Sequence, residues 1–178
     1  DAVPQLTGAN IPFVIRLRVV LLRDTGSPLS PFNAWQIIQG LETVGLRMKQ
    51  HCANAEKVVS FLETQKKVKN IIFPTNHQGE IKERAKKYLQ GGNGALVGAD
   101  LGTAEAGAKF IDNLKMLYHV ANIGDARSLA IHPATTTHSQ LNDKELLAAG
   151  VTPGYVRLSI GIEHPDDIIA DIKQALAA

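Results

Sequence analysis

The stretch Val156-Arg157-Leu158-Ser159-Ile160-Gly161 decides how the fold of this chain is interpreted, because apolar residues alternate along it with polar or small ones. A period of two is typical of a β-strand with one buried face. Arg157 then shares the opposite face with Ser159 and Gly161. The small residues leave room beside a guanidinium, whose planar fork suits a carboxylate or a phosphate. A half-exposed sheet whose polar face meets water explains the same pattern, and spacing alone favours it.

Helical patterns surround this strand. Ser30-Pro31 pairs a capping residue with a first-turn proline, so we expect a helical region to begin there. Beyond Gly45, apolar residues recur every three or four positions and predict a helix of about 20 residues. Its expected buried stripe is Met48, Cys52, Ala55, Val59 and Leu62.

Short strands are expected between the helices, and no repeat or long linker divides the chain. Turn residues and β-branched runs predict the strands Val68–Phe73, Ala95–Leu101, Tyr118–Ile123, Ser128–His132 and Tyr155–Ile162. Caps and apolar stripes predict the helices Ile81–Leu89, one opening at Thr103, Asp143–Ala149, and a last one opening at Pro165.

The bulk composition fits a globular protein of about one domain. The chain has 178 residues, 44% of them apolar and 20% charged, with a net charge of +2. Acidic and basic residues are interleaved, which argues against a nucleic-acid partner. The apolar stretch Ile11–Leu22 contains two arginines and is too short for a membrane span. A single cysteine, Cys52, fits a reducing, cytoplasmic location, and the start at Asp1 without methionine suggests a fragment.

Three other features could carry chemistry, and each has a simpler explanation. His132 and His138 lack the partners and spacing of a metal site, so we expect hydrogen-bonded loop histidines and no metal. Cys52 sits on an apolar stripe, which favours core packing. The glycine cluster Gly91–Gly94 precedes a strand instead of opening a helix, so it predicts a turn and no phosphate cradle.

Several motifs, taken in order, resemble the Cys/Met-metabolism family of pyridoxal-phosphate enzymes. They are Ser30–Trp35, Gly40–Thr43 with Leu46-Arg47, His51–Ala55, the polar loop Ala121–His138, and Val156–His164. The resemblance runs from about residue 11 to residue 176. It departs from the family at Pro74–His77, where relatives have a longer turn, and this concerns a surface loop only.

The resemblance implies an α+β fold, namely the C-terminal small domain of the PLP-dependent aminotransferase type I fold, a small sheet with helices packed on one side. Residues 1–30 would form a helical connection from the cofactor domain, and residues 31–178 the C-terminal domain. The Schiff-base lysine and most groups that bind pyridoxal 5'-phosphate would lie in an N-terminal portion of the same enzyme. The resemblance therefore implies no catalytic and no cofactor-binding residue in this chain, and a homotetrameric parent enzyme.

The same resemblance implies three substrate-binding residues. Arg157 matches the arginine that binds the substrate α-carboxylate. Asn122 would assist through its backbone or side chain, and Thr137 would brace the arginine. Orienting the substrate in this way selects which bond to Cα is aligned with the cofactor, so the contact directs the reaction as well as affinity.

The motifs Ala121–Ala126 and Thr135–Leu141 have the forms seen in the O-acetylhomoserine sulfhydrylase group of the family. Such a transferase acts in methionine biosynthesis, replacing the acetate of O-acetyl-L-homoserine by sulfide to give L-homocysteine. The isolated chain would be inactive. Methionine γ-lyase and cystathionine γ-synthase or lyase stay open, as do the sulfur donor and an acetyl or succinyl leaving group. A non-catalytic assembly module is the alternative from another class.

Overall fold

The structure is a computed structural model that describes residues 12–178, and the chain divides into two units between Thr43 and Val44. The first unit contains the helix α2 (Pro12–Arg16), the π-helix η1 (Leu17–Leu22), α3 (Arg23–Thr25) and α4 (Pro31–Glu42). Helix α4 begins where predicted, because the Ser30 hydroxyl accepts a hydrogen bond of 3.2 Å from the backbone N–H of Asn33.

The division after Thr43 lies beyond the boundary that the family resemblance implies after residue 30. Residues 1–11 of the expected helical connection lie outside the described residues, so that connection stays a prediction. Among residues 12–178, no helix combines the length and the apolar character that crossing a membrane requires.

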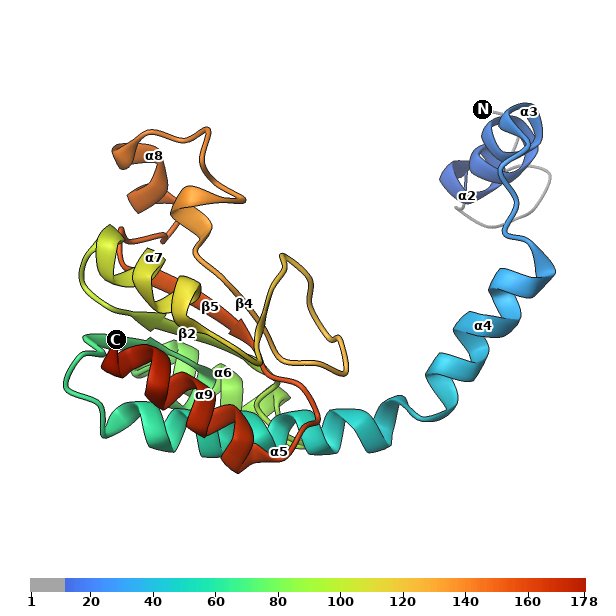
Figure 1. The fold of residues 1–178 in the computed structure, drawn as a ribbon. Coiled ribbons are helices and arrows are strands. Elements are labelled where there is room, and N and C mark those ends of the chain that lie inside the picture. The colour runs from blue at the N-terminus through green and yellow to red at the C-terminus, as the bar shows by residue number, and fades with distance from the viewer. Residues whose placement is uncertain (1–11) are drawn as a thin grey trace. The chain divides into compact units, whose positions relative to one another are not determined.

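The second unit is built on a five-stranded sheet with the strand order β1-β2-β5-β4-β3 (Figure 1). Its strands are β1 (Asn70–Ile72), β2 (Leu96–Asp100), β3 (Tyr118–His119), β4 (Leu129–Ile131) and β5 (Tyr155–Ser159). Neighbouring strands are antiparallel except β3 and β4, which are parallel. Every predicted strand is present but shorter than expected, and β5 takes the central place in the sheet.

Five α-helices complete this unit. They are α5 (Val44–Glu63), α6 (Gly79–Tyr88), α7 (Ala104–Asn113), α8 (Asp143–Ala148) and α9 (Pro165–Ala177), with short 3-10 turns η2 (Pro74–Asn76) and η3 (Pro133–Thr135). The predicted cap of α7 is confirmed, since the Thr103 hydroxyl accepts from the N–H of Ala106. Helix α8 has a full capping box formed by Asn142 and Glu145.

The core lies on the apolar face of β2 and β5. Val156, Leu158 and Ile160 are completely buried there, as the period of two predicts. Helices α5 and α9 lie side by side against this face, and α7 contacts both α9 and β5 (Figure 1). Buried residues of α5, α7 and α9 join the strand residues in one apolar cluster. The expected α+β architecture, with helices packed on one side of a small sheet, is therefore confirmed.

Candidate functional site

Arg157 lies in the middle of the central strand β5, on the face of the sheet opposite the core. Its neighbours in register are Gly98 of β2 and Ile131 of β4. The side chain is half-buried, and one terminal N–H group, on Nη2, donates a hydrogen bond of 3.3 Å to the backbone carbonyl of Asn122. A guanidinium has five N–H donors, so this contact orients the group and leaves a fork that can bind an anion.

Tyr155 shares the face of Arg157 and forms a wall beside it. A Cβ atom on Gly98 would lie 2.5 Å from Cε2 and 2.9 Å from the hydroxyl of Tyr155, so the ring packs directly over the glycine. Burial raises the pKa of the Tyr155 phenol, and the nearby charge of Arg157 acts in the opposite direction. The phenol is therefore neutral at neutral pH. Sequence reasoning overlooked Tyr155, although the period of two places it on this face.

Of the other two predicted site residues, the structure brings one to Arg157. Asn122 lies in the exposed loop between β3 and β4, and its backbone carbonyl makes the contact. Thr137 is exposed and follows η3, and its hydroxyl oxygen lies 2.9 Å from Nδ1 of His138. Within the described part of the chain, Thr137 and Arg157 share no hydrogen bond, so bracing by Thr137 stays a prediction.

His132 is a structural residue, as expected of a hydrogen-bonded loop histidine. It is 1% exposed. Its Nε2 donates to the carbonyl of Pro153 at 2.7 Å, and its Nδ1 lies 2.9 Å from the Thr135 hydroxyl. Both ring nitrogens are thus engaged by the loop. In the described part of the chain, no group of three or more His, Cys, Asp or Glu side chains could hold a metal ion.

The glycine cluster Gly91–Gly94 forms the predicted turn and packs on helix α5. Gly92 has a positive φ of 141°, and a Cβ atom there would lie 2.8 Å from the sulfur of Cys52. Glycine is required at this position by the close approach of the turn to the helix. Cys52 is half-buried beneath the turn. The cluster therefore has a packing role.

Nearly the whole chain matches the model of one protein family. The family is described as Cys/Met metabolism PLP-dependent enzyme, and its model matches residues 8–177. The chain belongs to this family. The expected membership, drawn from motifs spread along the chain, is confirmed.

Two similar relatives carry the name sulfhydrylase. O-acetyl-L-homoserine sulfhydrylase of Leptospira meyeri is 51% identical over 171 residues, covering 95% of this chain and 39% of the relative. Sulfhydrylase FUB7 of Fusarium oxysporum is 48% identical, over 92% of this chain and 38% of its own length. The chain thus spans about 39% of the first of these relatives, and it corresponds to their C-terminal portion.

A solved structure from Campylobacter jejuni has the same fold. It is assigned as an O-acetylhomoserine (thiol)-lyase and was solved with N'-pyridoxyl-lysine-5'-monophosphate. The TM-score is 0.88 at 41% sequence identity, and the match covers 97% of this chain and 42% of that chain. The fold is therefore that of a part of a PLP-dependent enzyme of this family.

Proposed function

We propose that this chain is the C-terminal part of a PLP-dependent O-acetyl-L-homoserine sulfhydrylase, which replaces acetate by sulfide to give L-homocysteine. The observation that carries the proposal is the guanidinium of Arg157, held by the Asn122 carbonyl on the face of the sheet opposite the core. The relatives at 44–51% identity that bear the sulfhydrylase name support the choice of reaction.

In this proposal Arg157 binds the α-carboxylate of the substrate through two parallel hydrogen bonds. The Asn122 carbonyl accepts from one edge of the guanidinium and fixes its plane, which directs the remaining donors toward the ligand. The neutral Tyr155 phenol beside the arginine adds no competing negative charge. Thr137 is proposed as a third residue of this site.

The chemistry at Cα and Cγ is proposed to belong to the N-terminal portion. When bound there, pyridoxal 5'-phosphate supplies the electron sink for carbanion chemistry. None of the site residues described above forms a phosphate cradle, and the glycine cluster is occupied by packing on Cys52. The residues of this chain therefore hold and orient the substrate, and we propose no catalytic or cofactor-binding residue among them.

The exposed apolar surface of α4 is evidence that another polypeptide covers this helix. Five large apolar side chains on one helix are more than half exposed, which is a surface that water disfavours. They are Phe32, Trp35, Ile37, Ile38 and Leu41. We propose that the N-terminal portion of the same enzyme covers them, within a cytoplasmic homo-oligomer that serves methionine biosynthesis.

The direct test is a product assay on the full-length enzyme with its cofactor. O-acetyl-L-homoserine and sulfide should give L-homocysteine and acetate. Release of methanethiol from methionine, or cleavage or synthesis of cystathionine, at a higher kcat/KM would assign the chain to a lyase or cystathionine enzyme instead. A full-length protein that turns over none of these substrates would favour the assembly module.

A further inference from the structure

The chain just after β5 is joined to the loop between β3 and β4 by a partly buried hydrogen-bonded junction. We call the trio Ser128, Gly161 and Glu163 the Glu163 junction. The Glu163 carboxylate accepts from the backbone N–H of Ser128 at 2.6 Å and from its hydroxyl at 2.9 Å. The Ser128 oxygen in turn accepts from the N–H of Gly161 at 2.9 Å. Ser128 is completely buried and Glu163 is half-buried, so the bonds to the carboxylate are partly shielded from water.

The two segments of the Glu163 junction approach too closely for any side chain at position 161. A Cβ atom on Gly161 would collide with the Glu163 carboxylate, and it would lie 2.5 Å from the carbonyl oxygen of Ala126. The N–H of Ile162 also donates to that Ala126 carbonyl at 2.9 Å. The loop backbone therefore lies directly on the end of β5.

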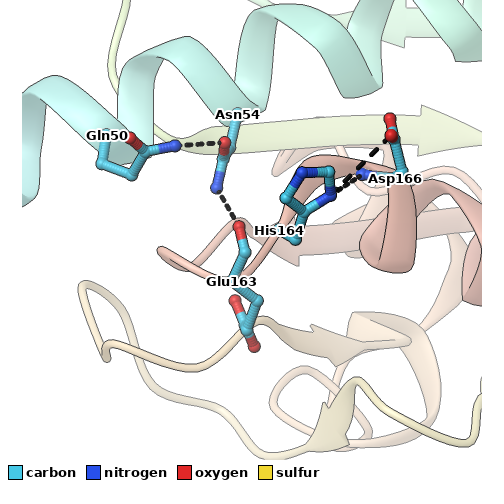
Figure 2. Close-up of polar contacts among 5 residues, drawn as sticks. All are labelled: Gln50, Asn54, Glu163, His164 and Asp166. Atoms are coloured by element: carbon cyan, nitrogen blue, oxygen red, sulfur yellow. Dashed lines mark hydrogen bonds and ion pairs between the residues drawn. The ribbon is translucent and has the colours of Figure 1, made fainter.

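The other side of the Glu163 junction is fixed to the core helix α5. The side-chain amide of Asn54, which is completely buried, donates to the carbonyls of Gly161 and Glu163 at 3.0 and 2.7 Å. Gln50 donates to the Asn54 carbonyl oxygen at 2.7 Å. In Figure 2 the Glu163 carbonyl points toward Asn54, whereas its carboxylate points away from α5. Glu163 thus connects helix α5 to the loop, because its backbone carbonyl binds Asn54 and its carboxylate binds Ser128.

The loop held by this connection is the one that orients Arg157. Residues 121–124 are exposed, and the carbonyl of Asn122 accepts from the guanidinium. Besides the junction, Gly124 donates to the Ser159 hydroxyl at 3.3 Å. An exposed loop with few contacts takes its shape from its anchors. The Glu163 carboxylate thus anchors the far end of the loop that carries the Asn122 carbonyl.

We infer that Glu163 is a positioning residue for the carboxylate clamp. It acts by holding residues 121–127 so that the Asn122 carbonyl fixes the plane of the Arg157 guanidinium. Glu163 itself touches neither substrate nor cofactor. The inference deepens the proposed function and rests on it only for the statement that the ligand of Arg157 is an α-carboxylate.

The test compares two ligands that differ only in the carboxylate, using the full-length enzyme with its cofactor. Calorimetry measures the Kd of L-norleucine, an α-amino acid without a leaving group at Cγ, and of 1-pentylamine, the same molecule without the carboxylate. Glu163→Ala should weaken L-norleucine by about tenfold, or about 1.4 kcal/mol, and leave 1-pentylamine unchanged. Glu163→Gln keeps one acceptor, so its Kd for L-norleucine should lie between the values of the wild type and of Glu163→Ala. The rate of amide hydrogen exchange in residues 121–127 should rise from the wild type through Glu163→Gln to Glu163→Ala.

Asp100→Ala is the matched control. Asp100 also accepts one backbone N–H, from Gly102, and one hydroxyl, from Thr152, at 2.8 and 2.9 Å. It joins the opposite end of the β2 and β5 pair. Its loss should lower thermal stability and leave the ratio of the two Kd values as in the wild type.

With O-acetyl-L-homoserine, Glu163→Ala should raise KM more than it lowers kcat.

An unchanged Kd ratio in Glu163→Ala, with unchanged exchange of residues 121–127, overturns the positioning role. If that variant does not fold, Ser128→Ala removes the hydroxyl bond of the same junction and must shift the ratio in the same direction. If the wild-type enzyme makes no L-homocysteine but Glu163→Ala still changes the Kd ratio as predicted, only the proposed reaction is refuted. A shift of equal size in Asp100→Ala also contradicts the inference, since it marks a general loss of stability.

Discussion

At the scale of single residues, Arg157 yields the sharpest prediction about substrate binding. Arg157→Lys in the full-length enzyme should raise KM for O-acetyl-L-homoserine by about tenfold or more, because an ammonium cannot reproduce a two-bond fork. Steady-state kinetics measures it. Arg84→Lys on α6, where the arginine pairs with Glu80 on the surface, is the control and should leave KM unchanged. Equal KM values for wild type and Arg157→Lys would count against the carboxylate assignment.

Asp171 yields a prediction about acid stability. Burial tends to raise the pKa of this carboxyl, but the backbone N–H groups of Leu117, Lys115 and Met116 donate to it and hold its pKa below the ordinary value. The ionised form therefore stabilises the fold above the unfolded-state pKa of about 3.9. This stabilisation is lost as the pH falls through the lower folded-state pKa.

Asp171→Asn should lower the free energy of unfolding by about 2 kcal/mol at neutral pH, because an amide cannot accept all three bonds. The difference between variant and wild type should shrink as the pH falls below about 4. Urea unfolding over a series of pH values measures it. Asp112→Asn, at an exposed position on α7, is the control and should change little. A difference independent of pH would show that the Asp171 charge has no such role.

Gly161 shows what residue patterns can and cannot predict. The period of two predicts Gly161 on the face of Arg157, and its small size was interpreted as room beside the guanidinium, but β5 ends at Ser159, two residues before this glycine. In the structure that space is taken by the Glu163 carboxylate and the backbone of Ala126. In a sequence, a glycine that leaves room for a ligand looks the same as one that leaves room for a second chain segment. Here part of the space is filled by the backbone of Ala126, which is distant along the chain.

At the scale of elements, helix α5 shows a similar limit. The predicted apolar stripe is right for Ala55, Val59 and Leu62, which are buried. Two polar residues, His51 and Asn54, are buried on the same helix, which apolar spacing alone does not predict. His51 Nδ1 donates to the carbonyl of Ile160 at 2.6 Å. Polar groups can be buried where their partners are backbone carbonyls, and these partners come from the distant end of β5.

Asn54→Ala should therefore destabilise the chain by about 3 kcal/mol, since it leaves one buried and one partly buried carbonyl without this donor and opens a cavity. Thermal or urea unfolding measures the change. Gln50→Ala is the matched control on the same helix, because it removes only the exposed residue that donates to Asn54. Its cost should stay below about 1 kcal/mol. A neutral Asn54→Ala would mean that water replaces the amide at the end of β5.

At the scale of the whole molecule, the order of elements and the family could both be predicted from the sequence. Caps such as Ser30 and Thr103 fix where helices begin through local bonds, so a local pattern suffices to find them. The division after Thr43 could not be predicted in this way. It depends on which helices find apolar partners elsewhere in the chain, and α4 contributes no buried residue.

The isolated polypeptide of residues 1–178 should not form L-homocysteine from O-acetyl-L-homoserine and sulfide when pyridoxal 5'-phosphate is added. Under the proposed function, the Schiff-base lysine belongs to the N-terminal portion, and only substrate-orienting groups such as Arg157 are present in this chain.

The exposed apolar surface of α4 should also enhance the fluorescence of an apolar dye, and adding the separately expressed N-terminal portion should reduce that signal. Trp35→Asp should weaken this assembly, because it buries a charge in an apolar interface. Turnover by the isolated chain at the rate of the full-length enzyme would contradict the division of roles on which the proposal rests.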